Sequence, residues 1–139
     1  MARARSSRLS AGTVVLDCAG LSLWCTADQR VTAIVREAQD NDFHVVVSAL
    51  TPIEAYHMRV KNDRFRWYLS RLKIEPVTDA ISLHAIDLLR EAGLHGHKYA
   101  IDAVVAATAL CAAKPVAILT SDADDMRKLC GKQVRIVTI

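Results

Sequence analysis

The sequence lacks the features that mark several common classes of protein. No apolar run reaches the roughly 18 to 20 residues that a helix needs to cross a bilayer. The amino terminus, MARARSSRLS, is basic but has none of the apolar core of a secretory signal peptide. These absences predict a cytoplasmic protein without a membrane partner.

Further absences exclude particular kinds of site. The four cysteines, Cys18, Cys25, Cys111 and Cys130, form no CxxC pair and no Cys/His spacing typical of zinc. The chain has no glycine-rich phosphate loop of the GxGxxG or GxxxxGKS/T type. Asp17 is followed by Cys-Ala, so the DxD pair of a phospho-aspartyl hydrolase is missing. The sequence therefore argues against bound zinc and against these phosphate chemistries.

The length and charge indicate one domain with a short basic extension. A chain of 139 residues, 52% of them hydrophobic, suits a single compact core. The net charge is +3, and Arg3, Arg5 and Arg8 account for that excess. We interpret residues 1–12 as a flexible basic arm and residues 13–139 as the domain. Contact between the arm and a phosphate backbone is the alternative.

Short β-rich segments alternate with helical segments along the chain. Strands are predicted at 13–17, 44–49, 116–120 and 134–139, with a short edge strand at 74–77. Helices are predicted at 30–41, 51–60, 62–72, 79–93, 99–113 and 122–130, with Thr51 and Thr78 as caps. Strands that are apolar on both faces indicate a parallel sheet covered on both sides. The predicted fold class is α/β, a three-layer α/β/α sandwich with a parallel sheet of about five strands.

Acidic residues gather at one edge of this predicted sheet. Asp17 ends the first strand, Glu54 lies in the first turn of the helix after the second strand, and Asp122 follows the VAILT strand. Asp102 lies about one turn into a helix that precedes a strand, so the start of that helix belongs to the same carboxyl edge. Asp125, three residues after Asp122, shares its helical face.

Asp102 is the only charged residue between Tyr99 and Ala113. An unpaired carboxylate in apolar surroundings is costly, or it takes up a proton, and neighbouring carboxylates raise the pKa further. A divalent cation removes this conflict, and an all-oxygen ligand set suits Mg²⁺ or Mn²⁺. The predicted metal ligands are Asp17, Asp102, Asp122 and Asp125. The predicted catalytic residues are Asp17, Glu54, Asp102 and Asp122.

Each acid also has a local interpretation. Glu54 completes a capping box with Thr51, and Asp102 can pair with Lys98 four residues earlier. Acids in the first turn of the last helix offset its macrodipole, and an acid at a strand end can hydrogen-bond a loop. These interpretations would require four coincidences at one edge of one sheet, so a metal site is favoured.

The ordered segments VVLDCAG, SALTPIEA, YAIDAVVAATA and LTSDADDM resemble the PIN-domain ribonucleases, and more narrowly the VapC-type toxins of bacterial toxin–antitoxin pairs. The resemblance begins at about Thr13, after a longer start than is usual in the family. It implies an α/β/α sandwich, Mg²⁺- or Mn²⁺-dependent RNA cleavage, a homodimer and an antitoxin partner that occludes the site. The positions that match the family's acidic quartet are Asp17, Glu54, Asp102 and Asp122. Asp125 matches an additional acid, and Thr120 or Ser121 a nearby hydroxyl.

Basic and aromatic residues alternate between Arg59 and Lys73. Basic side chains bind phosphates and aromatic rings stack on bases, so this segment is a candidate RNA contact. Packing in the core, in a dimer or against an antitoxin is an equal alternative. The sequence LHGHK precedes the Asp102 helix and can contact phosphate or be a loop without a role. The predicted RNA-binding residues are Arg59, Lys61, Arg64, Arg66, His97 and Lys98.

The sequence thus predicts an Mg²⁺-dependent endoribonuclease that acts as the toxin of a toxin–antitoxin pair. One alternative is a housekeeping PIN-domain nuclease that processes RNA without an antitoxin. The other is a catalytically inactive PIN-like interaction module. The complete set of acids argues against the module, because a binding module has no need of buried carboxylates.

Overall fold

The computed structural model describes residues 10–139, so most of the predicted basic arm lies outside the described residues. Five parallel strands form one sheet in the order β3-β2-β1-β4-β5. The strands are β1 (Gly12–Leu16), β2 (Phe43–Ser48), β3 (Lys73–Glu75), β4 (Val116–Thr120) and β5 (Arg135–Thr138). The described helices are α2 (Cys18–Cys25), α3 (Gln29–Asp40), α4 (Thr51–Ala55), α5 (Asn62–Leu69), α6 (Asp79–Ala92), α7 (Gly96–Leu110) and α8 (Ala123–Cys130).

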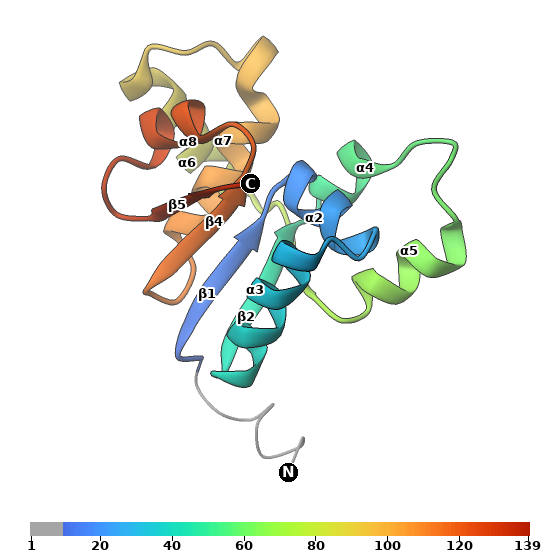
Figure 1. Cartoon of the computed structure of the whole chain (residues 1–139). Helices are drawn as coiled ribbons and strands as arrows, with labels where there is room; N and C mark the ends of the chain where they lie inside the picture. The colour runs from blue at the N-terminus through green and yellow to red at the C-terminus, as the bar shows by residue number, and fades with distance from the viewer. Residues whose placement is uncertain (1–9) are drawn as a thin grey trace.

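The helices cover both faces of the sheet, as the apolar strands require (Figure 1). Successive side chains of a strand point to opposite faces. Val15 of β1 accordingly packs in the core beneath α6, α7 and α8, while Val14 and Leu16 pack in the core beneath α2, α3 and α5. The predicted three-layer α/β/α sandwich with a parallel sheet is confirmed, and β3 is an edge strand as predicted.

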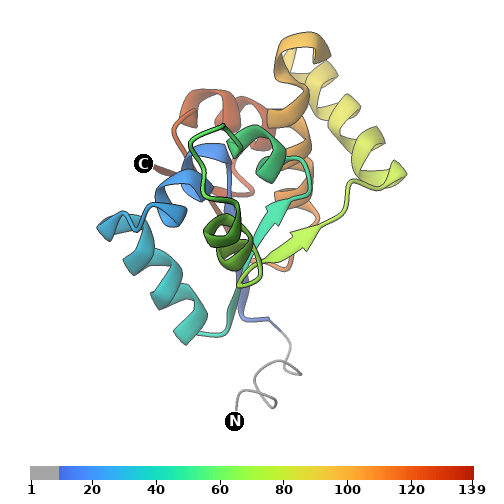
Figure 2. The ribbon, with the colours of Figure 1, turned by 90° about the vertical axis from the view of Figure 1, so that its right-hand side faces the viewer.

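Helix α7 is the most deeply buried helix on its side of the sheet. Every residue from Ala103 to Ala109 is buried. The helix lies against the sheet and packs against both α6 and α8 (Figure 2). Four alanines in this stretch keep the side chains small enough for close packing on every side. The apolar composition that made Asp102 conspicuous therefore has a packing cause.

Several predicted boundaries were wrong. Helix α2 was not predicted, because its sequence CAGLSLWC shows no clear apolar periodicity. The helix predicted at 51–60 ends at Ala55, because the chain becomes extended at Tyr56. The helix predicted at 62–72 ends at Leu69, and the one predicted at 99–113 runs from Gly96 to Leu110.

The prediction that Thr51 caps its helix was also wrong. The cap position is Leu50, which makes no side-chain capping bond, and Thr51 is the first residue of the helix. Its hydroxyl is buried and has no hydrogen-bond partner among the described residues. By contrast, the Thr78 side chain accepts a hydrogen bond from the backbone N–H of Ile81, and Gly93 ends α6 with a φ of 68°. Thr78 thus matches the predicted cap, and Gly93, the last residue of the range predicted at 79–93, ends the helix in the left-handed conformation that glycine favours.

Between residues 10 and 139, no helix has both the length and the hydropathy that crossing a bilayer requires. All four cysteines are free thiols.

Candidate active site

Asp17 is placed by the junction between β1 and α2. It directly follows β1, and its backbone N–H donates to the carbonyl of Leu119 on the neighbouring strand β4. Its carboxylate caps α2 by accepting a hydrogen bond of 2.9 Å from the backbone N–H of Gly20. The side chain is only 6% exposed. One carboxylate oxygen therefore has a structural role, and the group is held at the carboxyl edge of the sheet.

The burial of Asp17 disfavours its charge. Loss of solvation raises its pKa above the ordinary value, and the negative charge of Asp122 acts in the same direction. Hydrogen bonding by the Thr120 side chain and by the backbone of Gly20 and Ser121 opposes this rise, because it stabilises the carboxylate. The net effect is a raised pKa, as expected for an acid that lacks a cationic neighbour.

Thr120 connects Asp17 to Asp122. It ends β4, and its hydroxyl accepts a hydrogen bond of 2.9 Å from the backbone N–H of Asp122. Thr120 is completely buried. The family resemblance offered two hydroxyl groups near the acids, those of Thr120 and Ser121. The hydroxyl that hydrogen-bonds to both Asp17 and Asp122 is that of Thr120. The pairing of β1 with β4 brings these residues together, since Leu16 is the register partner of Leu119.

Glu54 reaches the same region from α4. Its side chain is exposed, and the thiol of Cys18, the first residue of α2, hydrogen-bonds to its carboxylate. Although Glu54 is exposed overall, partial loss of solvation at its carboxylate raises its pKa, and the charges of Asp17 and Asp122 raise it further. Sequence reasoning missed Cys18, which was treated as a small hydrophobic residue. Its position directly after the strand-end acid was the available indication.

Asp102 lies in the second turn of α7 and is half-buried. Burial is the largest cause that raises its pKa, from 3.8 to about 6. Four negative charges add to that rise, those of Asp122, Glu54, Asp125 and Asp17 in decreasing order. Charges act on one another in this way only at short range, because solvent and salt screen them. Asp102 therefore lies within electrostatic range of the other four predicted acids, which come from separate parts of the chain.

The local interpretations hold for some acids of residues 10–139 and fail for others: Asp17 caps α2 and Asp125 lies in the first turn of α8, but no ion pair forms between Lys98 and Asp102. No ion pair in this range involves any of the five acids. Lys98 does not pair with Asp102, and its ammonium lies 5.2 Å from the ring centroid of Tyr99 instead. The exposed acid Asp124, in contrast, has a local partner in Arg127 at 3.3 Å.

The acids suit a divalent cation by their chemistry, although their side chains are not assembled around one point. As oriented, no three His, Cys, Asp or Glu side chains within residues 10–139 could hold a metal ion together. Glu54 and Asp122 are exposed, so their carboxylates have room to turn. Repelling carboxylates without a basic partner are the oxygen donors that Mg²⁺ and Mn²⁺ prefer.

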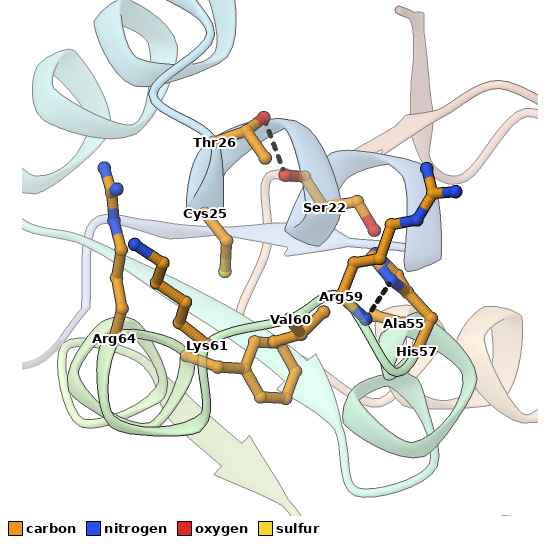
Figure 3. A pocket seen from close by; sticks show the side chains of 10 residues that line it. Ser22, Cys25, Thr26, Ala55, His57, Arg59, Val60, Lys61 and Arg64 are labelled. Atoms are coloured by element: carbon orange, nitrogen blue, oxygen red, sulfur yellow. Dashed lines mark hydrogen bonds between the residues drawn. The ribbon is translucent and has the colours of Figure 1, made fainter.

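The six predicted RNA-binding residues fall into different regions. Arg59, Lys61 and Arg64 line one cavity between α2 and the start of α5 (Figure 3). Arg66 is exposed on α5 but does not line that cavity. His97 and Lys98 are exposed in the first turn of α7, about one turn before Asp102.

The fold and the acids define a class of domain: a parallel three-layer α/β/α sandwich with a cluster of carboxylates at the carboxyl edge of its sheet. No protein-family model matches the chain, and no curated protein matches its sequence. Solved structures do match its fold.

Three solved structures illustrate the likeness. A chain of the crystal structure of VapBC2 from Rickettsia felis, bound to a DNA fragment from its promoter, superposes with a TM-score of 0.70 at 13% identity, over 91% of this chain and 98% of that one. A chain of FitAB bound to an IR36 DNA fragment superposes with a TM-score of 0.63 at 19% identity, over 90% of this chain and 94% of that one. A chain of a toxin–antitoxin complex from Klebsiella pneumoniae superposes with a TM-score of 0.63 at 19% identity, over 87% of this chain and 94% of that one. The predicted likeness to VapC-type toxins is thus confirmed at the level of the fold.

Proposed function

We propose that this chain is a metal-dependent endoribonuclease and the toxin of a toxin–antitoxin pair. The observation that carries the proposal is the set of five acids, Asp17, Glu54, Asp102, Asp122 and Asp125, which share one electrostatic environment without a cation from the described part of the chain. Carboxylates that repel one another in this way weaken the fold unless they serve a ligand.

Mg²⁺ or Mn²⁺ is the proposed cofactor, held by Asp17, Asp102, Asp122 and Asp125. Such an ion supplies an activated water and neutralises charge on the phosphate. The Asp17 carboxylate accepts hydrogen bonds from the backbone of Gly20 and Ser121 and from the Thr120 side chain, and its two oxygens have a further lone pair for a cation. Thr120 fixes the backbone of Asp122 by accepting its N–H. These hydrogen bonds hold the Asp17 side chain and the Asp122 backbone in place, whereas the exposed Asp122 carboxylate has room to turn towards a ligand.

Glu54 is the proposed proton acceptor for the attacking water. Its pKa is raised by burial and by neighbouring acids, which brings a carboxylate closer to the working range of a general base. The Cys18 thiol hydrogen-bonds to the Glu54 carboxylate and so favours one orientation of that side chain. Glu54 is exposed at the site, so a water molecule can reach it.

The proposed partners are RNA, a cognate antitoxin and a second copy of the chain. Support for an antitoxin comes from the matched structures, since one is a toxin–antitoxin complex and two were solved with DNA fragments. Several large apolar side chains are exposed, as expected of a protein with partners. Those on β3, on α6 and between them are Ile74, Val77, Leu83 and Ile86.

The test of the activity is incubation of the purified protein with total RNA, with Mg²⁺ and with EDTA, beside Asp102→Asn. We expect Mg²⁺-dependent cutting by the parent and none by the variant. The matched control is Asp124→Asn, which removes an exposed acid that pairs with Arg127 outside the cluster and should cut like the parent. Equal cutting by parent and Asp102→Asn would refute the site.

Two further observations separate this proposal from its alternatives. A small neighbouring reading frame for a DNA-binding protein supports the toxin, whereas its absence favours a housekeeping nuclease. Thermal melting with millimolar Mg²⁺ tests the inactive module, because a ligand that binds only the native state raises its stability. An unchanged melting temperature would favour the module.

A further inference from the structure

A cavity of about 330 Å³ lies between α2 and the start of α5, and none of the five acids lines it (Figure 3). One wall is the second half of α2, with Ser22 and Cys25, and the opposite wall is the chain from Ala55 to Phe65. Its volume is at the lower end of the roughly 300–1,000 Å³ typical of small-ligand sites. The cavity therefore has room for a unit no larger than about one nucleotide.

The rim of the cavity is positively charged. Arg59, Lys61 and Arg64 line it together with His57, and no acid does. In Figure 3, Lys61 and Arg64 stand on one side of the cavity and Arg59 on the other. None of these basic residues forms an ion pair within residues 10–139. Their charge is therefore available to an anionic ligand.

The interior of the cavity is apolar and uncharged. Ala55 and Phe65 are buried, and Val60 is half-buried. Burial raises the pKa of the Cys25 thiol to about 11, so this group is neutral at physiological pH. An aromatic ring and aliphatic groups beneath a cationic rim suit a ligand with a flat apolar part and an anionic part, which describes a nucleotide.

The cavity adjoins the acids through the same two helices. Ser22 lies one turn along α2 from Cys18, a distance of roughly 5 to 6 Å, and Cys18 follows Asp17 directly. Ala55 directly follows Glu54 on α4. The cavity and the acids therefore share α2 and α4, which makes them neighbouring regions of one surface.

We propose that this cavity binds one base of the RNA strand next to the cleaved phosphate, while Arg59, Lys61 and Arg64 hold the adjoining phosphates. The inference rests on the proposed function for its substrate class and adds a specificity site to it. Phosphate contacts position a strand, whereas a pocket for a base discriminates between sequences. The cavity, rather than the acids, then decides which RNA is cut.

The first test measures how much the basic residues of the rim contribute to RNA affinity. Binding of a short fluorescent single-stranded RNA is followed by anisotropy in EDTA, so that no cleavage occurs. Arg59→Ala and Arg64→Ala should each weaken binding about tenfold and lower the salt dependence by about one unit. The matched comparison is Arg66→Ala: Arg66 was also a predicted RNA contact and carries the same charge on the same helix, but it does not line the cavity, so its loss should weaken binding less than that of Arg64. Equal loss in Arg64→Ala and Arg66→Ala would overturn the proposal.

The second test fills the cavity without a change of charge. Cys25→Phe should weaken binding of the RNA but leave binding of an abasic strand of equal length unchanged. Ser22→Phe is the second variant, and thermal melting identifies which of the two is folded. Parent-like RNA binding by a folded variant would overturn the assignment of a base to the cavity.

The outcomes separate this proposal from the nuclease itself, because binding is measured without metal. Binding that depends on the cavity, with no cleavage in Mg²⁺, would keep the cavity and reject the nuclease. If the parent cleaves RNA but Arg59→Ala, Arg64→Ala and Cys25→Phe all bind RNA as the parent does, the nuclease is kept and the cavity proposal is rejected. If poly-glutamate binds through the cavity while RNA binds all variants equally, the cavity belongs to an acidic protein partner and the proposal fails.

Discussion

At the scale of single residues, the structure gives the lone acid of an apolar helix a physical cost, because Asp102 is half-buried and other acids raise its pKa. Its folded-state pKa of about 6 lies above the ordinary value of 3.8. The fold therefore disfavours the carboxylate and tolerates the protonated acid. The resulting loss of stability is absent below pH 4, grows as the pH rises towards 6, and is complete above that value.

Asp102→Asn should consequently stabilise the metal-free protein at pH 7.5 by about 1 to 2 kcal/mol, a range reduced for partial solvent screening. The gain should shrink to near zero below pH 4, because the parent is then protonated as well. Urea unfolding at several pH values in EDTA measures this. Asp124→Asn, outside the cluster, should show no such pH-dependent gain. A gain independent of pH would contradict the electrostatic explanation.

Thr120→Val tests the hydroxyl that connects two acids. The change leaves the Asp122 N–H without its acceptor and removes hydrogen bonding from Asp17, so we expect a loss of about 1 to 3 kcal/mol in unfolding free energy. The pKa of Asp17 should rise further. Thr138→Val is the matched control, because Thr138 is the exposed register partner of Thr120 on β5. Similar losses in both variants would show that the hydroxyl of Thr120 has no special role.

At the scale of elements, α2 is held close to the sheet by a glycine. A Cβ atom built on Gly20 lies 3.2 Å from the carbonyl oxygen of Leu119 and 3.4 Å from the side chain of Leu16. A larger residue must push α2 away from β4. Because the same helix begins at the Asp17 cap and carries Cys18, the displacement would also disturb the acids.

Gly20→Val should therefore destabilise the protein by roughly 1 to 3 kcal/mol and reduce cleavage. Gly96→Val is the comparison, since it also lies in the first turn of a helix but its Cβ meets only the side chain of Leu89 at 3.8 Å. It should leave stability and activity close to those of the parent. Thermal melting and the cleavage assay provide both measurements, and equal effects would contradict the close packing of α2.

The elements also show where sequence patterns stop being informative. The strands were found because they are apolar on both faces, and α6 because Thr78 and Gly93 mark its ends. Helix α2 was missed because its sequence carries glycine and serine and little amphipathic pattern, whereas packing against β4, α4 and α5 stabilises it. Helix α4 was extended too far because nothing in the residues after Ala55 forbids a helix.

At the scale of the whole molecule, one edge of the sheet carries unpaired acids and a basic cavity beside them. The acids should bind Mg²⁺, and a ligand at 100 times its dissociation constant adds about 2.7 kcal/mol of stability. The melting temperature of the parent should therefore rise with Mg²⁺ and fall again with EDTA. Asp102→Asn should respond less, whereas Arg64→Ala should respond like the parent. An equal rise in Asp102→Asn would remove Asp102 from the metal site.

The acids of the site could be predicted because parallel strands and the helices that follow them share one edge, so strand ends and helix starts in the sequence become neighbours in space. In this way the sequence placed five acids at one edge, and the structure puts Asp102 within electrostatic range of the other four; their role in metal binding or catalysis stays a prediction. Cys18 was not predicted, because a thiol beside a strand has no spacing that marks it. The cavity was not predicted either, because its walls come from a helix that the pattern did not reveal.

The sequence by itself determined the three-layer fold and the edge at which the acids meet, because apolar strands demand cover on both faces and parallel strands end together. The sequence also shows that the basic residues Arg64 and Arg66 directly flank Phe65. Only the tertiary structure decided that Thr120 joins Asp17 to Asp122, that Arg64 faces a cavity while Arg66 does not, and that no cation of residues 10–139 opposes the acids. The physical reason is that hydrogen bonds, pockets and ion pairs depend on distances between segments, which no local pattern specifies.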